Sequence, residues 1–268
     1  MSDTPWYKDW FNSPFYHQLY FERNEKEAES FIAQLIQHLH PKPGARMIDL
    51  ACGRGRHSKS LAAMGFDVTG VDLSPASIAY AQQFASPTLS FYEHDIRLPF
   101  WGNFFDYAFN FYTSFGYFDS RREHDAAMRT IANALKPGGI FVIDYLNVHY
   151  AEDHLVTHDD RQMGQTYYDL QRWHDDEHFY KKITITDPTL LTPVTYTEQI
   201  SKFTLGDFTD MLSFRGLQVQ DVYGDYQLAP YDIRKTPRMI IVARKKTDEP
   251  TDTKKRLYSD GRTGDALT

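Results

Sequence analysis

Two aspartates and two glycines lie in the first third of the chain at a spacing that suits nucleotide binding. Asp49 follows a short apolar run, Gly53 and Gly55 belong to a turn of small residues, and Asp72 ends a second apolar run. Glycines let the backbone approach a ligand closely, and an acid about 20 residues further on can accept hydrogen bonds from ribose hydroxyls. The spacing predicts strand, glycine turn, helix, strand and acid, which is the start of a nucleotide-binding βαβ unit.

The same residues argue against a dinucleotide ligand. The fingerprint for NAD or FAD has a third glycine that lets helix and strand pack closely, whereas Arg56 and His57 follow Gly55 here. A pyrophosphate would also meet the negative charge of Asp49, which is unfavourable. An ammonium and a sulfonium group would be attracted by that charge. S-adenosylmethionine carries both groups, together with a ribose for Asp72 and an adenine.

The motifs of the chain resemble, in content and order, those of class I S-adenosylmethionine-dependent methyltransferases. They are Asp49-x-Ala51-Cys52-Gly53-x-Gly55, Asp72, His94-Asp95-Ile96, Phe105–Asn110 and Leu135-Lys136-Pro137-Gly138-Gly139. The resemblance covers roughly residues 41–150 and 203–245. It is strongest to a bacterial group with Thr113-Ser114-Phe115-Gly116-Tyr117-Phe118 (TSFGYF) after the fourth strand. It implies the cofactor and the reaction type and leaves the acceptor open.

The resemblance also implies which residues bind the cofactor. These are Asp49, Ala51, Cys52, Gly53, Gly55, Arg56, Asp72, Leu73, Asp95, Ile96, Asn110 and Phe111. Arg56 is a candidate for holding the cofactor's carboxylate, because its charge opposes the dipole of the helix that it begins. Simple solvent exposure explains Arg56 equally well, and Asp95 can also be an ordinary cap at the end of a strand.

Aromatic residues after the fourth predicted strand are candidates for the methyl-transfer site. The candidate catalytic residues are Tyr112, Tyr117 and Tyr145, and the candidate acceptor contacts are Phe115, Phe118, Tyr226 and Arg238. Core packing is the alternative for the aromatic members. The segment Asn110-Phe111-Tyr112-Thr113 lacks the two prolines that amino-methylating nucleic-acid enzymes carry at this place, which argues against a nucleobase acceptor. Three histidines, His149, His154 and His158, lack a third ligand at zinc spacing, so we expect no metal site.

The elements that position these residues are expected to form an α/β fold. We predict a Rossmann-like, doubly wound, seven-stranded methyltransferase sheet from residues 41–150 and 203–245. Residues 1–40, rich in aromatic side chains and ending in an amphipathic helix, are predicted to form a helical lid; extension of the core is the alternative. Residues 151–202 alternate in polarity and predict an antiparallel β insertion of about three strands that caps the substrate. Residues 246–268 are predicted to be a flexible tail.

Composition narrows the class of protein. The chain has 268 residues, 41% hydrophobic residues and a formal charge of −7, which disfavours binding to phosphate backbones. No apolar run approaches membrane-spanning length, so we expect no membrane partner. Cys52 is the single cysteine, so an internal disulfide is excluded, and without a secretory signal we expect a cytoplasmic monomer or homodimer. The predicted function is methyl transfer to a small-molecule acceptor. Transfer to tRNA or protein, and S-adenosylmethionine binding without catalysis, are the alternatives.

Overall fold

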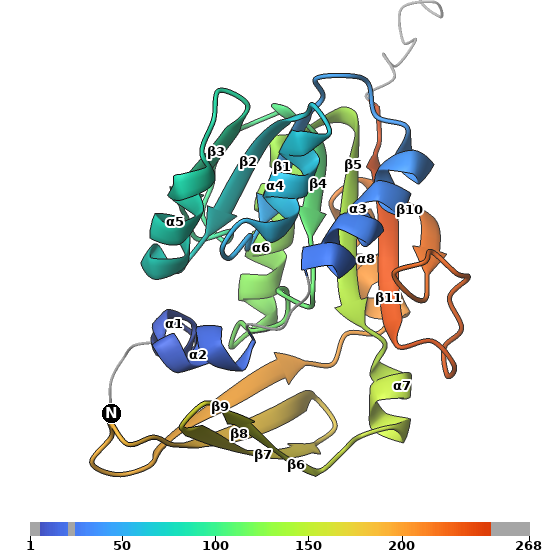
Figure 1. Ribbon diagram of the computed structural model, residues 1–268. Coiled ribbons are helices and arrows are strands. Elements are labelled where there is room, and N and C mark those ends of the chain that lie inside the picture. Colours follow the sequence, from blue (N-terminus) through green and yellow to red (C-terminus); the bar gives the residue numbers. More distant parts are fainter. Residues whose placement is uncertain (1–5, 21–24, 248–268) are drawn as a thin grey trace, which may run out of the picture.

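The computed structural model describes residues 6–20 and 25–247, which form a large mixed sheet and a smaller antiparallel sheet (Figure 1). The large sheet has the strand order β10-β11-β5-β4-β1-β2-β3. Its strands are β1 (Arg46–Leu50), β2 (Asp67–Asp72), β3 (Leu89–Glu93), β4 (Phe105–Asn110), β5 (Leu135–Leu146), β10 (Leu217–Tyr223) and β11 (Arg238–Lys245). The first five pair in parallel, and β11 is antiparallel to both β5 and β10. The predicted seven-stranded, doubly wound sheet is confirmed.

Helices cover both faces of this sheet (Figure 1). On one face are α3 (Glu25–Leu39), α4 (Arg56–Ala63), α5 (Pro75–Ala81) and the short 3-10 helix η1 (Gln82–Phe84), and on the other are α6 (Arg121–Ala134) and α8 (Leu205–Phe214). Two buried clusters result: Phe31, Leu61 and Ile78 pack on one side, and Met128 and Leu212 on the other. Parallel strands covered on both faces place their carboxyl ends at one common edge, where α/β proteins bind ligands.

Local sequence signals set the ends of these elements. Ser74 accepts a hydrogen bond from the backbone of Ser77 and caps α5, and Pro75 is its first residue. Thr204 and Asp207 form a capping box at the start of α8. The Pro-Gly-Gly residues 137–139 would ordinarily stop a helix and form a separate turn, but here β5 begins at Leu135, directly after α6, and the glycines lie where its register with β4 shifts. The turn is therefore an irregularity within the strand.

The smaller sheet contains one strand more than predicted. It consists of β6 (His158–Met163), β7 (Thr166–His174), β8 (His178–Thr186) and β9 (Val194–Ser201), paired in that order. Strand β6 was not predicted because it is a polar edge strand without alternation (His-Asp-Asp-Arg-Gln-Met). Helix α7 (Val148–Asp153) ends before His154, so His154 and His158 share no helical face. Within the described ranges no cluster of possible metal ligands occurs.

Two short helices, α1 (Trp6–Asn12) and α2 (Pro14–Leu19), lie between the smaller sheet and the carboxyl edge of the large sheet (Figure 1). Trp10 and Leu19 are buried against Tyr168 and Ile183 of the smaller sheet. The aromatic segment thus both extends a core and covers the sheet edge. Residues 1–5, 21–24 and, of the predicted tail, 248–268 lie outside the described residues. None of the described helices combines the length and apolar composition needed to cross a bilayer.

Candidate active site

The turn between β1 and α4 has a conformation that requires its glycines. Gly53 and Gly55 have φ angles of 55° and 77°, in the left-handed region that glycine enters without strain. A Cβ atom on Gly55 would lie 2.6 Å from the ring of Phe91, so this glycine also permits close packing of the turn on β3. Ala51 has a φ of 58°, an uncommon value for a residue with a side chain, and such strain concentrates at functional sites.

Asp72 ties the glycine turn to the end of β2. Its Oδ2 accepts a hydrogen bond from the backbone N–H of Gly53 at 2.8 Å, and its Oδ1 accepts one from Ser74 at 2.8 Å. Burial raises the pKa of this carboxyl. A carboxylate has about four acceptor positions, so Asp72 retains capacity for the hydroxyls of a ribose.

Asp49 was predicted to bind the cofactor, but its side chain is buried behind the glycine turn. Its side chain is 1% exposed and accepts a hydrogen bond from Ser58 Oγ at 2.6 Å. Burial raises its pKa to about 7, although the Ser58 hydrogen bond acts in the opposite direction. Asp49 therefore lies behind the turn and can act on a bound cation only through its charge, without direct contact.

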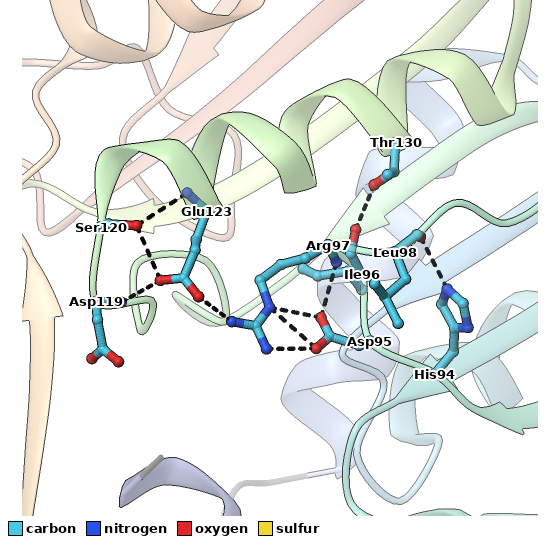
Figure 2. A network of polar contacts seen from close by, with 9 residues as sticks. All are labelled: His94, Asp95, Ile96, Arg97, Leu98, Asp119, Ser120, Glu123 and Thr130. Atoms are coloured by element: carbon cyan, nitrogen blue, oxygen red, sulfur yellow. Dashed lines mark hydrogen bonds and ion pairs between the residues drawn. The ribbon is translucent and has the colours of Figure 1, made fainter. Parts of the chain in front are cut away.

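A polar network holds the segment after β3 in place (Figure 2). Arg97 donates to both carboxylate oxygens of Asp95, with Nη2 to Oδ2 at 2.6 Å, and it also contacts Glu123 of α6. Thr130 donates to the carbonyl of Ile96. Burial alone would raise the pKa of Asp95, but the Arg97 hydrogen bonds outweigh it and lower the pKa. Asp95 is thus an oriented, ionised acceptor, and it also accepts a hydrogen bond from the backbone N–H of Arg97 at 3.0 Å, as a cap at the strand end does.

The segment after β4 is shaped by a buried carboxylate on β5. Tyr112 and Thr113 both have left-handed backbones, with φ of 57° and 58°. Asp144 Oδ2 accepts from the backbone N–H of Tyr112 at 2.8 Å, and the carbonyl of Asp144 accepts from Thr113 at 2.9 Å. Arg238 forms an ion pair with Asp144 at 2.6 Å, and the hydroxyl of Tyr226 donates to it at 3.2 Å. Arg238 and Tyr226 therefore hold Asp144 in place, and Asp144 in turn holds the segment after β4.

These segments surround a cavity of about 790 Å³ at the carboxyl edge of the large sheet. Nine of the predicted cofactor residues line it: Ala51, Cys52, Gly53, Arg56, Asp72, Leu73, Asp95, Ile96 and Phe111. The other three predicted cofactor residues, Asp49, Gly55 and Asn110, do not line the cavity. Asn110 is fully buried and donates to the carbonyl of Leu50 at 2.9 Å, while its Oδ1 has no hydrogen-bond partner among the described residues.

The predicted catalytic and acceptor residues are divided between the cavity and the core. Tyr112, Tyr117 and Phe118 line the cavity. Tyr145 is fully buried, donates to the carbonyl of Ser201 at 2.6 Å and has a pKa raised well above its ordinary value by burial. Phe115 packs in the core against α8. Since Tyr145, Phe115, Tyr226 and Arg238 are outside the lining, we assign them no contact with an acceptor.

The cavity is closed on its far side by α1 and α2 rather than by the smaller sheet. Tyr7, Phe11 and Tyr16 of these helices line it, while none of the described residues of 151–202 does. Ser74 donates to Asn12 at 2.7 Å and thereby joins α1 to the start of α5. The smaller sheet carries the lid helices, and so the insertion shapes the cavity indirectly.

Several residues of the lining were not among the predicted site residues, and Arg54, Tyr80 and His17 are examples. Arg54 could have been found, because the residue between the two glycines of such a turn has a backbone that must face the ligand. Tyr80 lies on α5, one helix away from the motif, and His17 lies on a six-residue helix without periodicity. No local pattern indicated these two.

Comparison with known proteins shows that part of the chain is similar to methyltransferases. Residues 47–139 match the model of a methyltransferase domain family. The dTDP-3-amino-3,4,6-trideoxy-alpha-D-glucopyranose N,N-dimethyltransferase of Streptomyces venezuelae is 29% identical over 115 residues, 43% of this chain and 48% of that protein. Glycine N-methyltransferase of Rattus norvegicus is 29% identical over 150 residues, 50% of this chain and 51% of that protein. The chain spans about half the length of these curated relatives.

Solved structures share the fold over most of the chain at low identity. An S-adenosylmethionine-dependent methyltransferase from Clostridium acetobutylicum has a TM-score of 0.72 at 18% identity, covering 87% of this chain and 96% of that chain. The S-adenosylmethionine-bound amino pentose methyltransferase CalS10 from Micromonospora echinaspora has a TM-score of 0.66 at 20% identity, covering 87% and 97%. At these identities the likeness shows the fold, and it confirms the predicted Rossmann-like class. With the family match, these findings support a class I methyltransferase domain; the narrower TSFGYF group stays a prediction.

Proposed function

We propose that this protein transfers a methyl group from S-adenosylmethionine to a small-molecule acceptor. The observation that carries the proposal is one cavity that joins the glycine turn and Asp72 to the rings of Tyr112 and Tyr117. Its volume of about 790 Å³ lies within the range of roughly 300–1,000 Å³ that is usual for ligand sites. A single enclosure can therefore hold a cofactor and an acceptor side by side.

The residues of the cofactor half fit S-adenosylmethionine by their chemistry. Asp72 would accept hydrogen bonds from the ribose hydroxyls, Leu73 and Ile96 would enclose the adenine, and Asp95 would accept from its amino group. The methionine part would lie along Ala51–Gly53, with Arg56 as the partner of its carboxylate. When bound, this cofactor supplies an activated methyl group.

The chain then has to align the acceptor and exclude water. Such positioning can supply roughly 7–11 kcal/mol of a reaction barrier in favourable cases. Burial raises the pKa of Tyr112, so its phenol is protonated near neutral pH and serves as a hydrogen-bond donor. An acceptor that is already nucleophilic, such as a neutral amine, would need no base at Tyr112.

A small acceptor is favoured over a macromolecule because two lid helices stand across the cavity. The overall charge of −7 also disfavours tRNA. The names of the Streptomyces venezuelae relative and of CalS10 describe methylation of sugars that carry amino groups, which supports a small acceptor here. Methyl transfer to protein or tRNA, and binding without turnover, remain the competing functions.

The proposal is tested by incubating the pure protein with methyl-labelled S-adenosylmethionine and three acceptor sets. The sets are small amines, including amino acids and amino sugars, unmodified tRNA, and a dialysed protein extract. We expect label transfer to at least one small amine and none to the macromolecules. Transfer only to tRNA or protein would establish the competing enzyme function, and tight cofactor binding without any transfer would establish a non-catalytic protein.

A further inference from the structure

Two arginines that line the cavity, Arg54 and Arg56, form no ion pair with a carboxylate of the described residues. The guanidinium of Arg54 lies 4.5 Å from the ring centre of Tyr80, and that of Arg56 lies 4.4 Å from the ring centre of Tyr112. Arg54 Nε and Arg56 Nη1 are buried and have no hydrogen-bond partner in the part of the chain that the structure describes. A buried donor without a partner is costly, more so when it is charged. Each arginine is therefore expected to meet an anion in the occupied site.

The proposed cofactor brings a single negative charge for these two positive side chains. S-adenosylmethionine carries one carboxylate, and its ammonium and sulfonium groups add positive charge to the cavity. Arg56, stacked on Tyr112 at the methyl-transfer end, is the residue already assigned to the carboxylate. Arg54 stacks instead on Tyr80 of α5. If the cofactor's carboxylate pairs with Arg56, Arg54 would have no anion of its own among the described residues and the cofactor.

A second cavity begins where Arg54 lies. It has a volume of about 530 Å³ and is formed by α2, the glycine turn and the β6–β7 turn, with Gln162 and Gly164 among its lining residues. Arg54 and His17 line both cavities. The second cavity therefore adjoins the first at these two side chains, and a ligand extended between them would pass Arg54.

His17 supplies a second polar group at the same place. Its Nε2 is buried and has no hydrogen-bond partner among the described residues. Burial, together with the positive charge of Arg54, lowers the pKa of His17 to about 4. The imidazole is therefore neutral near pH 7 and can present one N–H.

We propose that Arg54 and His17 form a subsite for an acidic group, a carboxylate or a phosphate, on the acceptor. Arg54 would pair with the anion, His17 would donate a hydrogen bond to it, and the rest of the acceptor would extend between the two cavities. This inference rests on the proposed function and narrows its substrate class to amines that also carry an acidic group. Arg54 would then be a specificity-determining residue.

The test uses the full chain saturated with S-adenosylhomocysteine, the product form of the cofactor. Inorganic pyrophosphate and succinate are titrated separately by calorimetry at low ionic strength, into the wild type, Arg54→Gln and Arg129→Gln. Arg129 is an exposed arginine on α6 and serves as the matched control. We expect one anion to bind the wild type and the control equally, and Arg54→Gln at least about tenfold more weakly, as loss of a charged pair predicts. The anion that binds more tightly identifies phosphate or carboxylate as the acidic group.

Binding of neither anion to the wild type, or equal binding to Arg54→Gln, would overturn the subsite. Because S-adenosylhomocysteine binding is measured first, intact cofactor binding with no anion binding contradicts only this inference, whereas loss of both contradicts the proposed function as well. A second readout covers the case of a poorly folded Arg54→Gln. In the wild type, the anion should raise the pKa of His17, measured by NMR, because negative charge stabilises the imidazolium. An unchanged His17 titration at saturating anion would also contradict the subsite.

Discussion

The two walls of the cavity are built in different ways. The cofactor wall, formed by the glycine turn and the segments after β2 and β3, is assembled from residues close in sequence. For example, the hydrogen bond from Gly53 to Asp72 spans 19 positions. The lid wall, formed by α1 and α2, is held by contacts between residues far apart in the sequence. One is the hydrogen bond from Trp10 Nε1 to Glu198 at 2.7 Å, 188 positions away. Local geometry therefore fixes cofactor recognition, whereas the acceptor side depends on how the two halves of the chain fold together.

Glu198 is the main polar connection of the lid wall. Its carboxylate is buried on β9 and accepts hydrogen bonds from Trp10 and from the hydroxyl of Tyr20, at 2.8 Å for the latter. Lys181 lies 3.8 Å from it and also contacts Tyr20. The Glu198 carboxylate thus links residues on both sides of α2 to the smaller sheet. A substitution of Glu198 can therefore loosen the lid helices without changing the cofactor wall.

The largest effect is expected from Asp144→Asn, because the segment after β4 depends on this carboxylate. Removing its charge leaves the partly buried Arg238 without its anion, and breaking a buried pair costs about 3–5 kcal/mol. The free energy of unfolding, measured by urea denaturation, should fall by about 3 kcal/mol. Asp153→Asn is the control, because Asp153 pairs with Arg234 at the surface, where solvent screens the pair, and it should change the free energy of unfolding far less. Equal losses in both variants would contradict the buried role of Asp144.

Glu198→Ala should loosen the lid and leave the cofactor wall intact. Buried donors of Trp10 and Tyr20 would lose a charged acceptor, an interaction of about 1.5–3 kcal/mol. Amide hydrogen exchange in α1 and α2 should become about 30-fold faster, corresponding to a loss of about 2 kcal/mol in local stability. Exchange in β1 and β2 should not change. Glu177→Ala, at an exposed turn of the same sheet, is the control; identical exchange in the two variants would remove Glu198 from this role.

Asp72→Ala should weaken S-adenosylmethionine binding at least about tenfold, or about 1.4 kcal/mol. The change removes the ribose acceptor and the two backbone hydrogen bonds that hold the turn. Asp67→Ala, at the exposed beginning of the same strand, should bind like the wild type. Unchanged affinity in Asp72→Ala would exclude Asp72 from the site.

The smallest effect concerns Asp49 and pH. Its pKa of about 7 means that it is largely protonated at pH 6 and ionised at pH 8. Ionisation strengthens attraction to the sulfonium, which S-adenosylhomocysteine lacks. The preference for S-adenosylmethionine over S-adenosylhomocysteine should therefore rise about threefold between pH 6 and pH 8. In Asp49→Asn the preference should be independent of pH, and a pH dependence that survives this substitution would show that another group is responsible.

The sequence predicts the cofactor wall better than the lid wall, because the contacts of the cofactor wall are local in sequence and those of the lid wall are not. Strand ends, glycine turns and helix caps are local, so Asp72, Gly53 and Ser74 could be placed from their neighbours. Tyr145 was misplaced among the site residues because nothing in its segment shows that its hydroxyl bonds to Ser201. His17 was missed because its position depends on contacts between α2 and distant segments, and strand β6 because its residues are polar.

The central claim is that the glycine turn and Asp72 bind a methyl donor rather than a dinucleotide. Calorimetric titration of the folded full chain with S-adenosylmethionine, S-adenosylhomocysteine and NADH tests it most directly. We expect saturable binding of the first two to one site per chain and no heat from NADH. Binding of NADH with no heat from either sulfur compound would contradict it.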